Sequence, residues 1–324
     1  MKLVMTLRLW AMLFLSFTIA ACGGPNFMDK TKIDGSILRG ENVYRGDLLF
    51  GRTVFIAKNF SVDTSSPSQF KKFGLCTGVI IRERYILTAA HCTVNIEEAR
   101  VIFTEDVNQP LLMSQVYTIK NFKIPTEYRE AIKHETRRNV LPGPNNRSHR
   151  YDLAILQLDR PISEAKYSKT YFDDLYSVKY LAQDKNRKSL IGYVAGYGRI
   201  SEYNNTQDDP HYATTTPPLN GTLMKAKLTL DLTDLAQRTI LRNQRFSTGV
   251  CSGDSGAPLF TLRDDELYLQ AIAIATFKVK DEDQNNIYNQ CYGESIYLNL
   301  DYHKNWILKT IFNLEKKWPE LTPI

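Results

Sequence analysis

Three short segments hold a serine, a histidine and an aspartate that could together cleave an acyl bond. Ser255 lies in the run Cys251–Pro258, His91 lies in the run Leu87–Cys92, and Asp152 precedes an apolar run. A serine hydroxyl is a weak nucleophile and needs a base within hydrogen-bonding reach. Histidine suits that role because its ordinary pKa is near 6.5, and a carboxylate can fix its tautomer. The expected chemistry is acyl transfer through a covalent intermediate.

The order of these residues along the chain, His91, Asp152 and then Ser255, resembles that of the chymotrypsin-like serine proteases. Subtilisins and α/β-hydrolases place the same residue types in other orders. Taken singly, the Ser255 loop is also typical of an ordinary turn, Asp152 of a strand cap, and His91 of a core histidine beside a disulfide. The resemblance implies that Ser255 is the nucleophile, His91 the base and Asp152 its partner. It also implies an oxyanion hole formed by the N–H groups of Gly253 and Ser255.

Short apolar segments separated by polar turns predict an all-β chain. They include Thr53–Ala57, Val79–Ile81, Leu153–Leu158, Tyr193–Ala195 and Ala271–Phe277. Gly196-Tyr197-Gly198 resembles a Gly-Trp-Gly segment of the same family.

The family's architecture is two packed six-stranded antiparallel β-barrels, expected here roughly at 37–165 and 166–300. The carboxyl-terminal segment, roughly 301–317, has apolar residues at helical spacing and predicts a packed helix. The resemblance therefore covers nearly all of residues 37–314 and places the peptidase domain at 37–324.

The chain has five cysteines. Cys22 follows Ile19-Ala20-Ala21 and resembles the lipidated cysteine of a bacterial lipoprotein. The other four allow three pairings by arithmetic alone. The family resemblance implies Cys76–Cys92 and Cys251–Cys291, which in turn implies an oxidising compartment.

The amino terminus is interpreted as a lipoprotein-type signal peptide at residues 1–21. Its apolar run, Leu9–Ala21, is shorter than the ~20 residues that span a bilayer. The expected location is the bacterial cell envelope, as an outer-membrane lipoprotein anchored through Cys22, or outside the cell by secretion after activation. The alternative is ordinary cleavage with Cys22 left as a free thiol.

Residues 22–36 are expected to be a propeptide or linker. Ile37-Leu38-Arg39-Gly40 resembles the family's mature amino terminus, although Arg39 replaces a glycine and Ser36 is not basic. The resemblance implies that an activating protease frees Ile37, whose α-amino group then pairs with Asp254. Because Cys22 is the only cysteine before Ile37, activation would release the enzyme from the membrane.

The resemblance places Gly249 at the base of the primary specificity pocket, where an aspartate would select Arg and Lys. Ser295 takes the other basal position, Val250 adds an apolar wall, and Phe277 narrows the pocket. A buried ammonium would be uncompensated there, so the preferred P1 residue is apolar and of moderate size. A one-residue slip in the alignment would instead aim Glu294 into the pocket and restore basic specificity.

The net charge of +6 is too small to indicate a nucleic-acid partner. Lys120–Arg150 holds eight basic and three acidic residues, and we interpret it as a solvated insertion loop; the alternative is an exosite for acidic partners. The remaining histidines are expected at the surface: His134, His149, His211 and His303. We expect no cofactor and no metal.

The sequence thus predicts an exported serine endopeptidase made as a zymogen, with a protein or peptide substrate and no nucleic-acid partner. Two alternatives stay open. One is an acyl hydrolase of the same chemistry, and the other is a catalytically silent protease-like binding protein.

Overall fold

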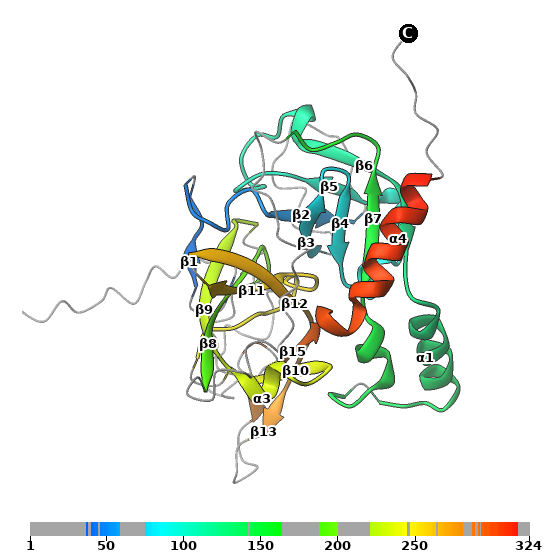
Figure 1. Cartoon of the computed structure of the whole chain (residues 1–324), viewed down its shortest axis with the longest axis vertical. Helices are drawn as coiled ribbons and strands as arrows, with labels where there is room; N and C mark the ends of the chain where they lie inside the picture. The colour runs from blue at the N-terminus through cyan, green and yellow to red at the C-terminus, as the bar shows by residue number, and fades with distance from the viewer. Residues whose placement is uncertain are drawn as a thin grey trace, which may run out of the picture. The chain divides into compact units, whose positions relative to one another are not determined.

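Six strands of the amino-terminal half close into a barrel in the order β2-β3-β4-β7-β6-β5 (Figure 1). Their bounds are β2 Thr53–Ala57, β3 Leu75–Arg82, β4 Tyr85–Thr88, β5 Arg100–Ile102, β6 Val116–Lys123 and β7 Ala154–Leu158. Every residue of β2, β4 and β7 is buried, because their side chains alternate between the barrel interior and surrounding structure.

The computed structural model describes residues 37, 40–44, 46–58, 75–141, 143–163, 188–199, 221–244, 247–263, 265–280, 287–288, 291 and 293–316. The predicted signal peptide, Cys22, the 22–36 propeptide, Arg39 and His211 lie outside these residues.

A second sheet has the strand order β1-β9-β8-β11-β12-β15-β10. Its strands are β1 Glu41–Asn42, β8 Ser189–Gly196, β9 Met224–Asp231, β10 Thr239–Asn243, β11 Pro258–Arg263, β12 Glu266–Phe277 and β15 Glu294–Asn299. The six strands from β9 to β10 match the expected number, and β1 adds a seventh at one edge. Within the described ranges β10 does not pair with β9, so this sheet stays open. Two short strands, β13 Val279–Lys280 and β14 Ile287–Tyr288, form a separate ribbon.

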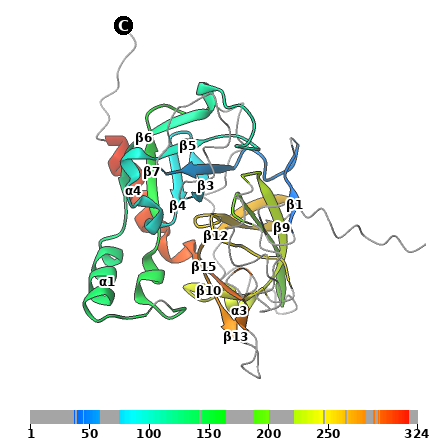
Figure 2. The ribbon, with the colours of Figure 1, turned by 180° about the vertical axis from the view of Figure 1, so that it is seen from behind.

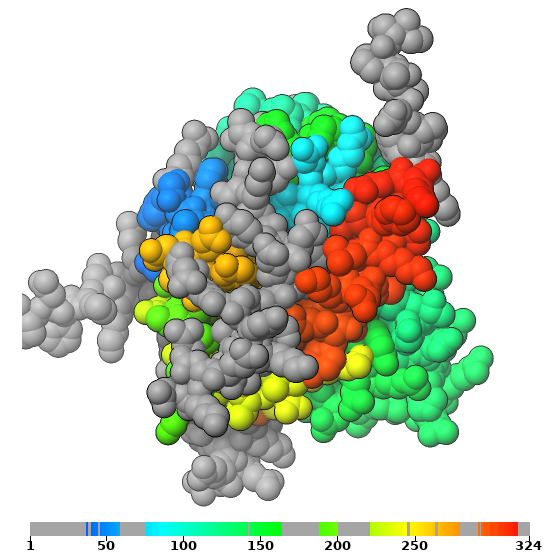
Figure 3. Space-filling model, viewed as in Figure 1, coloured from blue at the N-terminus to red at the C-terminus, as the bar shows by residue number. Residues whose placement is uncertain are grey.

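The helices are mostly short. They are η2 Ala90–Thr93, η3 Ile96–Glu98, η4 Met113–Gln115, α1 Thr126–Arg137, η5 Arg147–Tyr151, α3 Leu232–Leu235, η8 Leu300–His303 and α4 Lys304–Lys316. Helix α4 buries Ile307, Ile311 and Leu314 in the same core as the first barrel, as the spacing predicted. In Figure 3, α4 (red) and the α1 region (green) lie on the same face. The all-β, chymotrypsin-like fold class is confirmed.

The basic insertion is not a loop throughout, contrary to the prediction. Residues 126–137 form helix α1, which lies beside η5 in both views (Figures 1 and 2). Tyr128, Ile132 and Glu135 follow one another at helical spacing and therefore share one face. Polar residues fill most of the helix, which hid this face from a search for apolar periodicity.

Candidate active site

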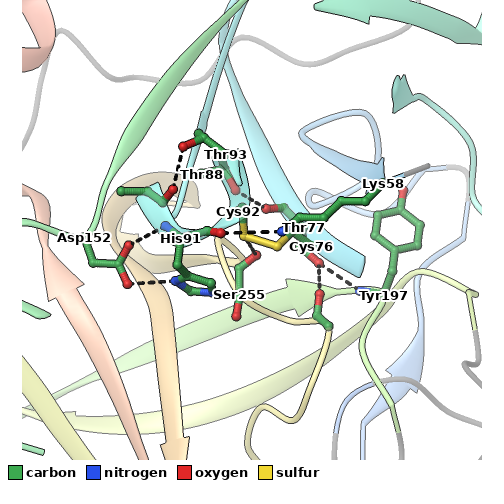
Figure 4. The surroundings of a disulfide bond; sticks show 12 residues. Lys58, Cys76, Thr77, Thr88, His91, Cys92, Thr93, Asp152, Tyr197 and Ser255 are labelled. Atoms are coloured by element: carbon green, nitrogen blue, oxygen red, sulfur yellow. Dashed lines mark hydrogen bonds and ion pairs between the residues drawn. A yellow bond between two sulfur atoms is a disulfide. The ribbon is translucent and has the colours of Figure 1, made fainter. Parts of the chain in front are cut away.

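The register of the first barrel brings His91 and Asp152 together. Strand β4 pairs with β7 so that Thr88 lies opposite Ala154. His91 follows Thr88 in η2, and Asp152 precedes Ala154, so both reach the same end of this strand pair. Asp152 Oδ2 lies 2.8 Å from His91 Nδ1, and Asp152 Oδ1 accepts a 3.0 Å hydrogen bond from the His91 N–H (Figure 4).

Burial differs between the two residues in the way a general base requires. The Asp152 side chain is 5% exposed, whereas the His91 side chain is 37% exposed and can be reached by a substrate. Burial alone would lower the pKa of His91, but the charge and hydrogen bond of Asp152 outweigh it and raise that pKa. A proton held on Nδ1 by Asp152 leaves Nε2 as the acceptor.

The loop that carries Ser255 is fixed to strand β3 by Thr77. The Thr77 N–H donates to the Ser255 carbonyl at 2.8 Å, and Thr77 Oγ1 donates to the Gly253 carbonyl at 3.1 Å. Figure 4 shows Ser255 beside the His91 imidazole, on the side away from Asp152. Within the described residues the Ser255 hydroxyl forms no hydrogen bond; such contacts in unliganded enzymes often tighten only with substrate.

Two backbone amides of this loop are available to a ligand. The N–H groups of Asp254 and Gly256 donate to the carbonyls of Cys251 and Ala273, at 3.0 and 2.6 Å. Those of Gly253 and Ser255 have no acceptor among the residues that the structure describes. Unpaired donors at these two positions are what an oxyanion hole requires.

The side chain of Asp254 is fully buried beneath the loop. Its carboxylate accepts hydrogen bonds from the N–H groups of Gly198 at 2.8 Å and Cys251 at 2.9 Å. A Cβ on Gly196 or Gly198 would lie 2.2 or 2.5 Å from this carboxyl group, which explains both glycines of the Gly-Tyr-Gly segment. Burial raises the pKa of Asp254 to about 7, although the two backbone N–H groups oppose the shift.

The predicted activation residue, Ile37, is completely buried in the core of the second sheet, which also contains Val194 and Val250. Its carbonyl accepts a 2.8 Å hydrogen bond from the Gly40 N–H. Among the described residues, no hydrogen bond or ion pair joins Ile37 to Asp254, and no cation pairs with Asp254.

Both predicted disulfides, Cys76–Cys92 and Cys251–Cys291, are present. The first joins β3 to the turn that holds His91, and the second ties the start of the Ser255 loop to the segment before β15. Cys76, His91 and Cys92 cluster within 4.8 Å, but both sulfur atoms are in the disulfide and cannot act as thiolate ligands.

The residues predicted to line the primary specificity pocket do not all point into it. Val250 is 1% exposed and packs in the core of the second sheet, so its side chain does not form the expected apolar wall. Ser295 is fully buried on β15, and Glu294 points to the opposite face because side chains alternate along a strand. Phe277 stacks edge-on against His149, with ring centroids 5.6 Å apart.

Gln244, which the sequence analysis missed, occupies the space beside Gly249. It is 1% exposed; its Nε2 donates to the carbonyls of Val250 and Cys291, at 2.8 and 3.0 Å, and its Oε1 accepts from the Val250 N–H at 2.7 Å. A Cβ on Gly249 would lie 1.9 Å from Gln244 Oε1. The uncharged amide of Gln244 therefore fills the space that a side chain at position 249 would need.

Two other expectations need correction. His303 is buried, not exposed, because η8 turns it inward beside Tyr151. Burial and the nearby Arg238 lower its pKa to about 4. His149 is only partly exposed, whereas His134 is exposed as predicted. Thr77 was also missed, although it directly follows Cys76, since its role depends on contacts distant in sequence.

In the described part of the chain, none of the helices has the length and apolar character needed to span a membrane.

Comparison with known proteins agrees with the geometry of the site. The Trypsin family profile matches residues 57–307. The chain is 25% identical to CLIP domain-containing serine protease B4 of Anopheles gambiae over 251 residues, covering 74% of this chain and 63% of that protein. It is 26% identical to Serine protease 7 of Drosophila melanogaster, covering 73% of this chain and 57% of that protein. Granzyme M of Rattus norvegicus is 27% identical, with 59% of this chain and 66% of that protein covered.

The chain thus spans about three fifths of the length of the insect relatives. All three relatives are animal proteins, and they give no support to the predicted bacterial origin. The profile match extends over most of the sequence and includes His91, Asp152 and Ser255. The chain therefore belongs to the trypsin family.

Proposed function

We propose that this protein is a serine endopeptidase in which Ser255 is the nucleophile and His91 the general base. One observation carries the proposal. The imidazole is oriented by a buried carboxylate beside a loop in which the N–H groups of Gly253 and Ser255 have no acceptor among the described residues. Bond cleavage through an acyl-enzyme requires this combination.

Each group has a role in the reaction. Ser255 Oγ attacks the substrate carbonyl while its proton passes to His91 Nε2, and Asp152 stabilises the resulting imidazolium. The N–H groups of Gly253 and Ser255 stabilise the oxygen that gains charge. His91 then returns the proton to the leaving amine, which breaks the peptide bond. Water, deprotonated by the same imidazole, hydrolyses the acyl-enzyme.

A free strand edge supports a peptide substrate. Strand β11 pairs with β12 only as far as Ile272, and Ala275–Phe277 pair with β15 alone among the described residues. The other edge of this segment can therefore accept an extended chain through backbone hydrogen bonds.

We further propose an apolar P1 residue of moderate size. Gly249 and Gln244 offer no carboxylate to an incoming ammonium or guanidinium, whose lost hydration would be uncompensated.

Activation is proposed to follow cleavage before Ile37, which would supply a cation for the buried Asp254. We also propose that the protein is exported after removal of residues 1–21 and that Cys22 is lipidated. Mass spectrometry of the mature amino terminus tests both. If Cys22 is unmodified, or if the mature chain begins at another residue, there is no lipid anchor at Cys22 and activation does not release the enzyme from a membrane.

The proposal is tested with activated protein whose amino terminus has been verified as Ile37. Peptides with an apolar P1 residue should be hydrolysed by the wild type and by S252A, a matched change in the same loop, but not by S255A. Ester turnover without peptide turnover would favour the acyl hydrolase. Peptide binding without hydrolysis of any acyl substrate would favour the silent binding protein.

A further inference from the structure

A cavity of about 680 Å³ lies next to His91 and Asp152, which form part of its lining. Its other walls come from the inner face of helix α1, from the 139–149 segment and from the end of β12. Helix α1 and the 139–149 segment belong to the basic insertion, for which the sequence suggested a site only as an exosite for acidic partners.

One part of the rim and walls of this cavity is apolar. Ile132, Val140 and Leu141 are 40, 43 and 83% exposed at its margin, and Ile274 and Phe277 line it from β12. A methylene chain or ring could bury apolar surface against these side chains.

The lining carries negative charge in a protein whose net charge is positive. Glu135 and Asp152 line the cavity, and none of its described lining residues is lysine or arginine. Arg129, Lys133 and Arg137 of helix α1 are exposed and do not line it. The negative charge is therefore local to this cavity.

Glu135 is 9% exposed and lacks a cationic partner among the described residues. Its Oε1 accepts from the Ser148 N–H at 2.9 Å, and its Oε2 accepts from Ser148 Oγ at 2.7 Å. Asp152 is already paired with His91, whereas Glu135 has only neutral donors. A nearly buried carboxylate without a counter-charge gains most from an approaching cation.

We propose that this cavity is a subsite for a lysine or arginine side chain of the substrate, at a position near the scissile bond other than P1. The apolar stem packs against Ile132, Val140 and Phe277, and the cationic tip lies at Glu135. This inference rests on the proposed function. The insertion then selects a lysine or arginine side chain of the substrate, while the primary pocket at Gly249 selects an apolar P1 residue.

Peptides that differ at one residue test the subsite. Each keeps an apolar P1 residue and carries lysine, or norleucine as the uncharged match, at P4, P3, P2, P1′ or P2′ in turn. Their Kd values are measured by fluorescence anisotropy on activated S255A protein whose amino terminus has been verified as Ile37, in which binding is independent of turnover. Lysine should bind about tenfold more tightly than norleucine for at least one position, the effect of one charge-assisted contact.

Variants distinguish the effect of the Glu135 charge from effects on folding. E135Q keeps the shape and should abolish the lysine preference. E130Q, on the exposed part of the same helix, should leave it unchanged, and S148A should retain it because the carboxylate remains. Equal binding of lysine and norleucine at every position, or a preference that survives E135Q, would overturn the subsite. A Glu135-dependent preference in a protein that cleaves nothing would support the subsite and reject the proposed function.

Discussion

The buried carboxylate of Asp254 predicts an unusual pH dependence of stability in the uncleaved chain. Its pKa is about 7 in the folded protein, against about 3.9 in an unfolded chain. The folded state therefore holds this proton more tightly. The stability contribution is fully present below pH ~4 and is lost as pH rises toward 7, by about 4 kcal/mol at ~1.4 kcal/mol per pKa unit.

The assay is urea unfolding between pH 4 and 8, followed by circular dichroism, in an S255A background that prevents self-digestion. Other groups titrate as well, so the quantity of interest is the difference between the parent and D254N. That difference should fall by about 4 kcal/mol from pH 4 to pH 8, in favour of D254N. The matched control is D231N, because Asp231 is an exposed carboxylate, and it should follow the parent at every pH.

A difference that does not change with pH would mean that Asp254 is not desolvated as the structure indicates. A difference of the opposite sign would mean that a cation already lies beside Asp254 before cleavage. If cleavage before Ile37 supplies that cation, the cleaved protein should reverse the sign, because a paired carboxylate has a lowered pKa and loses its contribution as pH falls.

Three further predictions concern the site. T77V removes the Oγ1 hydrogen bond to the Gly253 carbonyl, so the free energy of unfolding should fall by about 1–2 kcal/mol. In kinetic assays, kcat should drop more than KM rises. An unchanged kcat would show that Thr77 does not position the Ser255 loop. G249A places a Cβ 1.9 Å from Gln244 Oε1 and should cost about 2 kcal/mol, measured by urea unfolding. Q244A alone is also destabilising, because it leaves buried backbone groups unpaired, so the Q244A/G249A double variant should lose less stability than the two single losses added together. A G249A variant as stable as the wild type would refute the contact. The acid limb of kcat/KM should lie above pH ~6.5, because the neighbouring carboxylate raises the pKa of His91; a limb below that value would argue against the pair.

The features that could be predicted from the sequence are those marked by short local motifs. His91, Asp152 and Ser255 stand in short segments whose residue types are tied to their chemistry, and both disulfides follow from the same resemblance. Apolar segments bounded by turns predicted the β class. These features depend on short stretches of sequence, which a single chain displays directly.

Contacts between distant segments account for what was missed. Gln244 faces Gly249 only because β10 and the 249–251 segment meet in the folded chain. Val250 points into the core rather than the pocket, which depends on backbone direction and not on residue type. Helix α1 is mostly polar, and its single buried carboxylate, Glu135, gave no periodic apolar signal.

Covalent labelling shows whether His91 makes Ser255 nucleophilic. Activated protein would be treated with a fluorophosphonate, and the modified residue located by peptide mapping in the wild type and in H91A. If His91 activates Ser255, the wild type carries a single adduct on Ser255 and H91A carries little or none. An unlabelled wild type, or equal labelling of Ser255 in H91A, would contradict it.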